Sequence, residues 1–467
     1  MKLYNTIIRK VENFEPLLSP TVSIYTCGPT VYDYPHVGNW FTFIRYELLV
    51  RVLRSQHLQP NWIMNITDVG HLVSDADEGE DKLEKGARRE GKTAWEVAQF
   101  YTDNFIEGME LLNFVQPNYM PKATDHIAEQ IELIKKLELK GFTYVIDDGV
   151  YYDTSKFPRY ASFALLDVDE QIAGKRVEFN KQKINSTDFA LWKFSPKDSK
   201  RDMEWESPWG IGYPGWHLEC SAMCMKYLGE TIDIHAGGID HLPVHHTNEI
   251  AQSEAVTGKP LAKFWMHTNH VSVNGERIGK SLGNAITLEE VAAQGFTMMD
   301  FRLHVLESHY RTQSKFSWGS LESSQNRLKN YGMVADMRWQ PRSNIDSTEI
   351  TNEISKASRL IEDALADDLN TPKALAVISG IFSQIESKGL SQDNVGPFND
   401  LLVVIESSLG INLLRPDISS AQKDLLKARE QSRTNKDWQK SDKERDILAQ
   451  QGIGVLDSET GPVWFHL

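Results

Sequence analysis

Four side chains in this sequence are of the types that could together hold one metal ion. Cys27 and Cys220 can each supply a thiolate. His245 and Glu249 are four residues apart, so on a helix they share a face and can present a nitrogen and an oxygen to one ion. The set would complete a tetrahedral zinc site, but the four positions form no compact motif. Cys224 lies one helical turn from Cys220 and is either a rival ligand or a buried structural thiol.

The segment Pro35–Asn39 (PHVGN) is a candidate phosphate site, because it lies between a predicted strand and a predicted helix. Unpaired amides and the dipole at the start of a helix attract phosphate. Gly38 lets a nucleotide approach the backbone, and His36 can donate a hydrogen bond to developing negative charge. By itself the segment is weak evidence, since a histidine and a glycine before a helix are ordinarily only a turn.

Two other glycine-containing segments could also approach a nucleotide. Residues 275–281 (GERIGKS) resemble a P-loop, but their first glycine is one residue too close to Gly-Lys-Ser, so that interpretation fails. A mobile loop that delivers Lys280 to a phosphate remains open, as does a solvated hairpin end. In residues 233–240 (DIHAGGID) two glycines end a predicted strand, and Asp240 could accept from ribose hydroxyls; a tight turn is the simpler alternative.

Alternating strands and helices must position these segments. Residues 21–26, 62–67 and 231–234 are predicted strands, and a helix is predicted from Phe41. This alternation indicates an α/β parallel sheet, which binds ligands at the carboxyl ends of its strands. From about residue 124 to 200 the pattern changes, which predicts an insertion; Asn274-Gly275 then predicts a hairpin turn. The chain beyond residue 284 is predicted to be mostly helical, with breaks at 340–347 and 387–400.

Composition bounds the class of protein. The chain has 467 residues, with 50 basic against 65 acidic side chains, and a net charge of −15 argues against a protein that coats nucleic-acid duplexes. Three scattered cysteines predict a reducing compartment and not a disulfide scaffold. The first residues lack the apolar core of a signal peptide, and no run of residues is long and apolar enough for a membrane span. We therefore expect a soluble cytoplasmic enzyme.

Five blocks of the sequence together resemble the cysteinyl-tRNA synthetases, which are class I enzymes. The opening YTCGPTVYDYPHVGN is similar to that family's first cysteine and its HIGH-type motif. The later blocks follow in the family's order, as GWHLECSAM, IDIHAGGID, HHTNEIAQSEA and GERIGKSLGN. The resemblance continues to KDWQKSDKERDIL and GPVWFHL near the C-terminus, so it covers nearly the whole chain.

The resemblance implies a role for each matching position. The implied zinc ligands are Cys27, Cys220, His245 and Glu249, and the implied cysteine pocket includes Thr67 and Trp216. The implied catalytic residues are His36, Asn39, Lys280 and Ser281. ATP is expected to contact Gly38, His235, Gly237, Asp240 and Lys280. The anticodon is expected to be read by Arg433, Trp438, Asp442, Arg445 and Asp457.

The family's fold and reaction are implied as well. A Rossmann-like catalytic domain (1–123 and 206–300) would hold a connective insertion (124–205), and a mostly helical tRNA-binding region would follow (301–415, then 416–467). Such an enzyme uses ATP with Mg²⁺ to convert L-cysteine to cysteinyl-adenylate, releases pyrophosphate, and transfers cysteine to the 3′ end of tRNA(Cys). Zinc would exclude serine by binding the substrate thiolate. We expect a monomer.

Four features depart from the family pattern, and two other functions stay open. Asn39 takes the last HIGH position, and Arg277 replaces the first lysine of the KMSKS-type loop. Tyr213 stands where a basic residue is expected, and the stretch 68–93 is unusually long and acidic, with no role that we can assign.

One alternative function is that of a cysteine ligase with a small amine or amino-sugar acceptor, which would not need the helical region. The other is a catalytically silent RNA-binding paralogue, against which His36, Lys280 and the zinc set argue.

The C-terminal tail supports RNA binding modestly. Residues 421–450 hold eight basic and six acidic residues, a net +2 within an acidic chain. On one helix, Trp438, Asp442 and Arg445 share a face and offer an unpaired base a stacking ring, an acceptor and a donor. Arg433 joins that face only if a cap near Asn435 starts a new helix or if its side chain reaches in from the side. An ordinary charged amphipathic helix is the alternative.

Overall fold

The structure is a computed structural model that describes residues 1–70, 81–160, 162, 180–196, 201–279, 282–342, 347–458 and 461–467. Lys280, Ser281 and residues 71–80 of the acidic stretch therefore lie outside the described residues. The chain forms two compact units, the first being residues 1–290 with 310–315 and the second residues 291–309 with 316–467. Among the described helices, none combines the length and the apolar character needed to cross a membrane.

A four-stranded parallel sheet organises the first unit, which confirms the predicted α/β class. Its order is β10-β9-β3-β4, with β3 (Thr21–Thr26), β4 (Gln59–Met64), β9 (Ile232–Gly238) and β10 (Ala262–Thr268). β3 has the predicted bounds, whereas β4 begins and ends three residues before the predicted strand. Pro60 is tolerated in β4 because this strand lies at the edge of the sheet. β9 continues through the glycine pair that was expected to end it.

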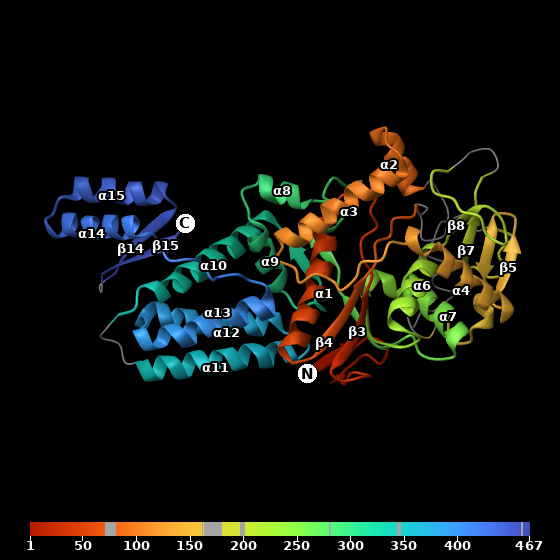
Figure 1. Cartoon of the computed structure of the whole chain (residues 1–467), viewed down its shortest axis with the longest axis horizontal. Coiled ribbons are helices and arrows are strands. Elements are labelled where there is room, and N and C mark those ends of the chain that lie inside the picture. Colours follow the sequence, from red (N-terminus) through yellow and green to blue (C-terminus); the bar gives the residue numbers. More distant parts are fainter. Residues whose placement is uncertain are drawn as a thin grey trace. The chain divides into compact units, whose positions relative to one another are not determined.

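The first helix, α1 (Val37–Ser55), packs against β4 and β9 of the parallel sheet, and Figure 1 shows it beside β4. It begins at Val37 and not at Phe41, because His36 and Asn39 form a capping box. The His36 ring accepts from the Asn39 amide at 3.3 Å, and the Asn39 side-chain oxygen accepts from the His36 amide at 3.1 Å. The remaining helices of this part of the chain are α2 (Lys82–Glu90), α3 (Ala94–Leu111), α4 (Ile127–Leu139), α6 (Trp216–Leu228), α7 (Thr247–Thr257) and α8 (Leu288–Ala293).

An antiparallel sheet is inserted between β4 and β9, as the change of pattern predicted. Its strands, in sheet order, are β5 (Thr143–Ile146), β6 (Gly149–Tyr152), β7 (Phe189–Phe194) and β8 (Gly212–Pro214). Tyr152 and Phe189 are buried on neighbouring strands, with their rings stacked at 5.0 Å and 10°. Such aromatic pairs contribute beyond their buried area, and this one gives the insertion part of its apolar core.

Two hairpins flank the parallel sheet. The first, β1 (Lys2–Asn5) with β2 (Lys10–Asn13), is tied to β10, since the Thr6 amide donates to the Trp265 carbonyl at 2.9 Å. The second joins β11 (Val271–Val273) to β12 (Glu276–Arg277). Its turn has positive φ at both central residues, 52° at Asn274 and 87° at Gly275, as the Asn-Gly signal predicted.

The second unit is mostly helical, as predicted. Its helices are α9 (Met298–Leu306), α10 (Trp318–Asp336), α11 (Ser347–Ala366), α12 (Thr371–Lys388), α13 (Gln392–Leu409), α14 (Ser420–Thr434) and α15 (Trp438–Gln450). The short strand β13 (Ser314–Phe316) precedes α10, lies mostly within the first unit and forms a sheet with β11 and β12. Helices α11, α12 and α13 lie side by side (Figure 1).

Two details of the second unit differ from the prediction. The predicted break at 387–400 is wrong over most of its length, because Ser391 caps α13 and that helix contains Pro397. The chain also ends in a hairpin and not a helix, formed by β14 (Ile453–Ser458) and β15 (Gly461–His466). Ile453 and Trp464 of this hairpin are buried with Leu448 of α15, which explains why the strands pack there.

Candidate functional site

The four proposed metal ligands meet at the carboxyl end of the parallel sheet. Cys27 follows β3, Cys220 lies on α6, and His245 and Glu249 come after β9. One ligand atom from each side chain lies within 4.8 Å of every other, and all four residues are buried. Residues far apart in the sequence are thus brought to one point by the parallel strands, which deliver their carboxyl ends to one edge.

An irregular helical turn positions His245, the histidine among the four proposed ligands. Residues Leu242–His246 form one turn of π-helix that runs into α7. His245 Nε2 lies 3.0 Å from Glu249 Oε1, which is the i, i+4 contact expected on a helix face. Single π-helical turns inside helices are frequent at functional sites, because they shift side chains out of regular helical register.

A second group of potential ligands overlaps the first. Cys27 and Glu249 also lie within 4.8 Å of His235 and His246, and all are buried. His246 Nε2 is 3.4 Å from Cys27 Sγ, and His235 Nε2 is 2.9 Å from Glu249 Oε2. Cys224, the rival ligand, belongs to neither group among the described residues and is fully buried on α6.

The cluster holds several ionisable groups out of contact with water. Despite the opposing effect of burial, the Glu249 carboxylate raises the pKa of His245 to about 10, and His235 and His245 lower the pKa of Glu249 below its usual value. The hydrogen bond with Cys27 lowers the pKa of the Cys220 thiol to about 7, while burial raises that of Cys27. Thiol, imidazole and carboxylate donors at this spacing fit a divalent metal ion, which would balance the buried negative charge.

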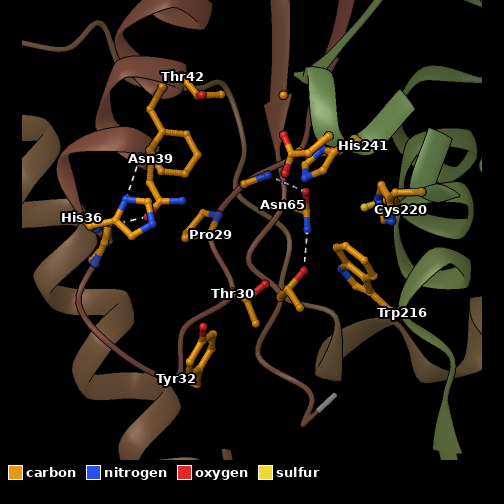
Figure 2. A pocket seen from close by; sticks show the side chains of 18 of the residues that line it. Pro29, Thr30, Tyr32, His36, Asn39, Thr42, Asn65, Trp216, Cys220 and His241 are labelled. Atoms are coloured by element: carbon orange, nitrogen blue, oxygen red, sulfur yellow. Dashed lines mark hydrogen bonds between the residues drawn. The ribbon is translucent and has the colours of Figure 1, made fainter. Parts of the chain in front are cut away.

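Next to the cluster lies a cavity of about 400 Å³ (Figure 2). Three of the ligands, Cys27, Cys220 and His245, form part of its wall. Trp216 and Thr67 also line it, and the Trp216 ring packs 4.4 Å from the His245 ring. The Asn65 amide donates to the Thr67 hydroxyl at 2.9 Å. A small molecule in this cavity can therefore touch the candidate metal ligands, the indole ring and the hydroxyl at once.

The opposite side of the cavity is formed by the start of α1. His36 and Asn39 line it, and their mutual capping bonds are drawn in Figure 2. Gly38 lies just behind this wall, where a Cβ would be 2.7 Å from the Ile278 side chain and 3.0 Å from the His36 ring. Only glycine fits without displacing its neighbours. The first amides of α1 thus border a cavity large enough for a nucleotide.

Of the residues expected to contact ATP, the three in or just after β9 are not equivalent. Asp240 lines the cavity. His235 instead lies within the sheet, where it stacks on Trp265 at 4.6 Å and 12° and contacts Glu249. Gly237 is buried next to the His246 ring, and a Cβ there would collide with that ring. His235 and Gly237 therefore lie behind the cavity wall and not on its surface.

Several side chains of the site were not singled out from the sequence. His217 Nδ1 is 2.9 Å from His245 Nδ1, and Asn65 bridges Thr67 and the Gly28 amide. His241 lines the cavity, and burial lowers its pKa to about 4. Their positions in the sequence could have indicated two of them, because His217 directly follows Trp216 in GWHLEC and His246 directly follows His245. Nothing in the spacing indicates that these rings pack together.

The five proposed anticodon residues lie close together in the second unit. Helix α14 ends at Thr434 and α15 begins at Trp438, so the chain does break near Asn435. The Arg433 guanidinium consequently lies 5.5 Å from the centre of the Trp438 ring.

Ion pairs connect the remaining anticodon candidates. Asp457 pairs with Arg433 at 3.0 Å and accepts two hydrogen bonds from Arg429, at 2.8 and 2.9 Å. Asp442 pairs with Arg445 at 3.3 Å. Trp438 is 56% exposed, so part of its ring is accessible to a ligand.

Two family models and several known proteins match this chain over most of its length. A family model described as tRNA synthetases class I (C) catalytic domain matches residues 13–326, and a DALR domain model matches residues 361–414. A cysteine–tRNA ligase of Treponema denticola is 41% identical over 498 aligned positions, covering 100% of each chain. Cysteine–tRNA ligase 1 of Burkholderia lata is 41% identical and covers 100% of this chain and 97% of its own. The cysteine–tRNA ligase of Chlorobium chlorochromatii is 41% identical, covering 99% of each chain.

A solved structure shares the fold. The methionyl-tRNA synthetase of Mycobacterium tuberculosis, in complex with methionyl-adenylate, superposes with a TM-score of 0.60. The match covers 84% of this chain and 92% of that one at 13% sequence identity. At that identity the likeness concerns the architecture alone.

Proposed function

The chain belongs to the cysteine–tRNA ligases, a family of class I aminoacyl-tRNA synthetases, and from this premise we propose which of its residues perform each part of the reaction. Its substrates are L-cysteine, ATP and tRNA(Cys). The observation that carries the assignment of residues is the meeting of a thiol, imidazole and carboxylate cluster with a cavity that starts at the N-terminus of α1.

The metal ion is proposed to be zinc, one per chain, held by Cys27, Cys220, His245 and Glu249. This set is favoured over the group with His235 and His246, because three of its members line the cavity and could share the ion with a substrate. When bound, zinc supplies a strong preference for a thiolate over a hydroxyl. A steric pocket alone separates substrates that differ by one small group by about 1–3 kcal/mol, so the ion accounts for the exclusion of serine.

Thr67 and Trp216 are proposed to hold the rest of the cysteine. Both line the cavity next to the proposed ligands. The indole lies against the ring of His245, so it can close over a substrate whose sulfur faces the metal. The Thr67 hydroxyl is held by Asn65, which fixes its position before the substrate arrives.

Activation of cysteine is proposed to take place between α1 and the KMSKS-type loop. Negative charge grows on the phosphates as the carboxylate attacks, and the amides at the start of α1, with His36 and Asn39, would stabilise it. Lys280 and Ser281 are proposed to act from the other side, with Mg²⁺ arriving on ATP.

The nucleoside of ATP is proposed to lie across the carboxyl end of β9. Gly38 allows its close approach, and Asp240 is placed to accept from the ribose hydroxyls. Gly237 and His235 support this wall from behind, since each packs against the ring of His246.

Anticodon reading is proposed for the cluster in the second unit. The exposed Trp438 ring offers a stacking surface, and Arg433 and Asp457 flank it with donor and acceptor groups. Asp442 and Arg445 extend the same surface along α15. An enzyme that transferred cysteine to a small amine would not need an anticodon-binding surface. A catalytically silent RNA-binding paralogue would not need the cavity with its candidate metal ligands.

The finer organisation is also proposed. We infer a catalytic domain in two parts (1–123 and 206–300) around a connective insertion (124–205), then a helical region (301–415) and a small anticodon-binding domain (416–467). A monomer in the cytoplasm is the expected working form, which light scattering and cell fractionation would check.

The experiment that tests the proposal is charging of a tRNA(Cys) transcript by the purified chain, with serine as the competing amino acid. We expect cysteinyl-tRNA to form, zinc to be present at one per chain, and serine not to be transferred. Metal-replete protein that exchanges pyrophosphate with serine as well as with cysteine would refute the assignment of selectivity to the metal cluster.

A further inference from the structure

A second cavity, of about 310 Å³, lies at the carboxyl end of β10, the outer strand of the parallel sheet. It belongs to the first unit, and its walls come from the β1–β2 turn, the end of β10, the turn after β9 and the segment around residue 311. We call it the Arg9 cavity. Its described lining consists of Tyr4, Thr6, Arg9, Ile239, Leu242, His267, Asn269 and Arg311.

The charges of the Arg9 cavity have one sign. Arg9 and Arg311 both line it, and no carboxylate is among its described lining residues. The Arg311 guanidinium lies 4.6 Å from the centre of the Tyr4 ring, which holds this flexible side chain at the rim. Guanidinium groups present several donors in a plane and match phosphate oxygens well. The cavity therefore suits an anion with several oxygens.

The backbone at Arg9 gives a second reason to regard this wall as built for a ligand. Arg9 has φ of 57°, in the left-handed region, and its amide donates to the Asn5 carbonyl at 2.8 Å. A glycine or asparagine would adopt this turn more readily than an arginine. Side chains that hold a disfavoured backbone conformation cluster at ligand sites. The backbone conformation of the turn therefore does not explain why the residue is an arginine, and a role of its side chain in the cavity does.

Hydrogen bonds tie the walls of the cavity to β10 and its end. The Trp265 amide donates to Asn5 Oδ1 at 3.2 Å, which ties the hairpin to β10 next to the Thr6 contact already described. The Asn269 side chain donates to the Arg311 carbonyl at 2.8 Å and fixes that segment to the end of β10. The two arginines are thus carried by elements that are both anchored to one strand.

The Arg9 cavity is separate from the cavity that we assign to ATP and cysteine. In the turn after β9, Asp240 and His241 line the first cavity, whereas Ile239 and Leu242 line the Arg9 cavity. The turn is therefore a partition with one pair of side chains on each side. A nucleotide bound against Asp240 lies on the other side of this partition from Arg9.

We propose that the Arg9 cavity receives a backbone phosphate of the bound tRNA, with Arg9 and Arg311 as its donors. The chain carries a net charge of −15, so a polyanion can approach only where cations are grouped locally. Of the family's substrates, ATP is accounted for by the first cavity, and tRNA is the other that carries phosphate. The same chemistry would also accept free inorganic phosphate or pyrophosphate, so the test separates these sources.

The test uses the full chain with Arg9→Asn, Arg311→Gln and the control Lys10→Gln. Asparagine tolerates the left-handed turn, so Arg9→Asn removes the charge without adding strain. Lys10 is exposed beside Arg9 and does not line the cavity, so its variant reports the loss of one nearby charge alone. KM for tRNA(Cys) in charging is measured over a range of salt concentrations, with tRNA-independent pyrophosphate exchange as the reference reaction.

For Arg9→Asn we expect KM for tRNA to rise about threefold to tenfold, because an exposed charge-assisted contact is lost. The slope of log affinity against log salt should become shallower by about 0.7–0.9, the contribution of one phosphate. An unchanged KM and slope, or an equal change in Lys10→Gln, would overturn the proposal. So would an exchange rate that falls by the same factor, since the substitution would then act on the fold.

The second arm titrates inorganic phosphate and pyrophosphate as inhibitors of charging. If Arg9→Asn weakens their inhibition and leaves KM for tRNA unchanged, the cavity binds a free anion and the tRNA assignment is wrong. If their inhibition is equal in the variant and the parent while KM for tRNA rises, the phosphate belongs to the tRNA backbone.

Discussion

Replacement of Trp438 by alanine should separate RNA recognition from cysteine activation. Trp438 is 56% exposed, and the ring contact that the structure gives it is with the Arg433 guanidinium at 5.5 Å. A cation–π contact at an exposed site contributes about 0.5–1 kcal/mol. The substitution should therefore lower the free energy of unfolding by no more than about 1 kcal/mol, which urea unfolding can measure.

The effect on tRNA use should be larger than the effect on stability. Stacking of a base on an aromatic ring is worth about 1–3 kcal/mol, so kcat/KM for tRNA(Cys) should fall roughly 10- to 100-fold. Cysteine-dependent pyrophosphate exchange should barely change, because we assign that reaction to the first unit, whereas Trp438 lies in the second. The assays are charging and exchange on one protein preparation.

Two controls make the result decisive. Gln439 is the exposed neighbour of Trp438 on α15, and Gln439→Ala should leave charging unchanged because consecutive helix positions face different directions. A transcript with an altered anticodon should lose little further activity with Trp438→Ala, since it lacks the contact already. If exchange falls as much as charging, or both transcripts lose activity equally, the ring supports the fold and does not read a base.

Three further predictions rest on the residue roles that we propose. Cys220→Ser should lose bound zinc or cysteine affinity while Cys224→Ser keeps both, as judged by metal analysis and exchange; the reverse pattern would replace our ligand set. Lys280→Ala should slow exchange by about 10²–10³ with little change in cysteine affinity, and an unchanged rate would remove this residue from the mechanism. The hydrogen bonds from Arg429 lower the pKa of Asp457. The ionised carboxylate therefore stabilises the folded state at every pH above its unfolded pKa of about 3.9, and this stabilisation is lost as the pH falls through the lower folded pKa. Asp457→Asn should therefore flatten the acid side of the curve of unfolding free energy against pH, and an unaltered curve would contradict the pairing.

Local sequence signals predicted the elements that depend on short-range chemistry. The β-branched and aromatic run 21–26 is a strand with the predicted bounds, and the Asn274-Gly275 turn has the expected positive φ angles. The i, i+4 spacing of His245 and Glu249 likewise predicted a contact, and the contact is present although His245 lies on the π-helical turn that precedes α7.

Features that depend on packing between distant segments could not be predicted in this way. Alternate residues of a strand face opposite sides, and nothing local to IDIHAGGID indicates that His235 faces Trp265 and Glu249. The helix through Pro397 and the C-terminal hairpin were missed for a similar reason. Their apolar residues, such as Phe398 and Trp464, are buried by neighbouring elements whose positions the sequence does not state.

The ligand set has a consequence for the order in which the chain is made. Cys27 is synthesised early, whereas Cys220, His245 and Glu249 follow only after the whole inserted sheet. An ion bound by all four therefore cannot be captured by a nascent chain until β9 and the first residues of α7 have been made. Until then Cys27 is an exposed thiol without its partners, open to oxidation or to the wrong metal. With the ligand set that we propose, metal capture would require the two halves of the catalytic fold to have come together.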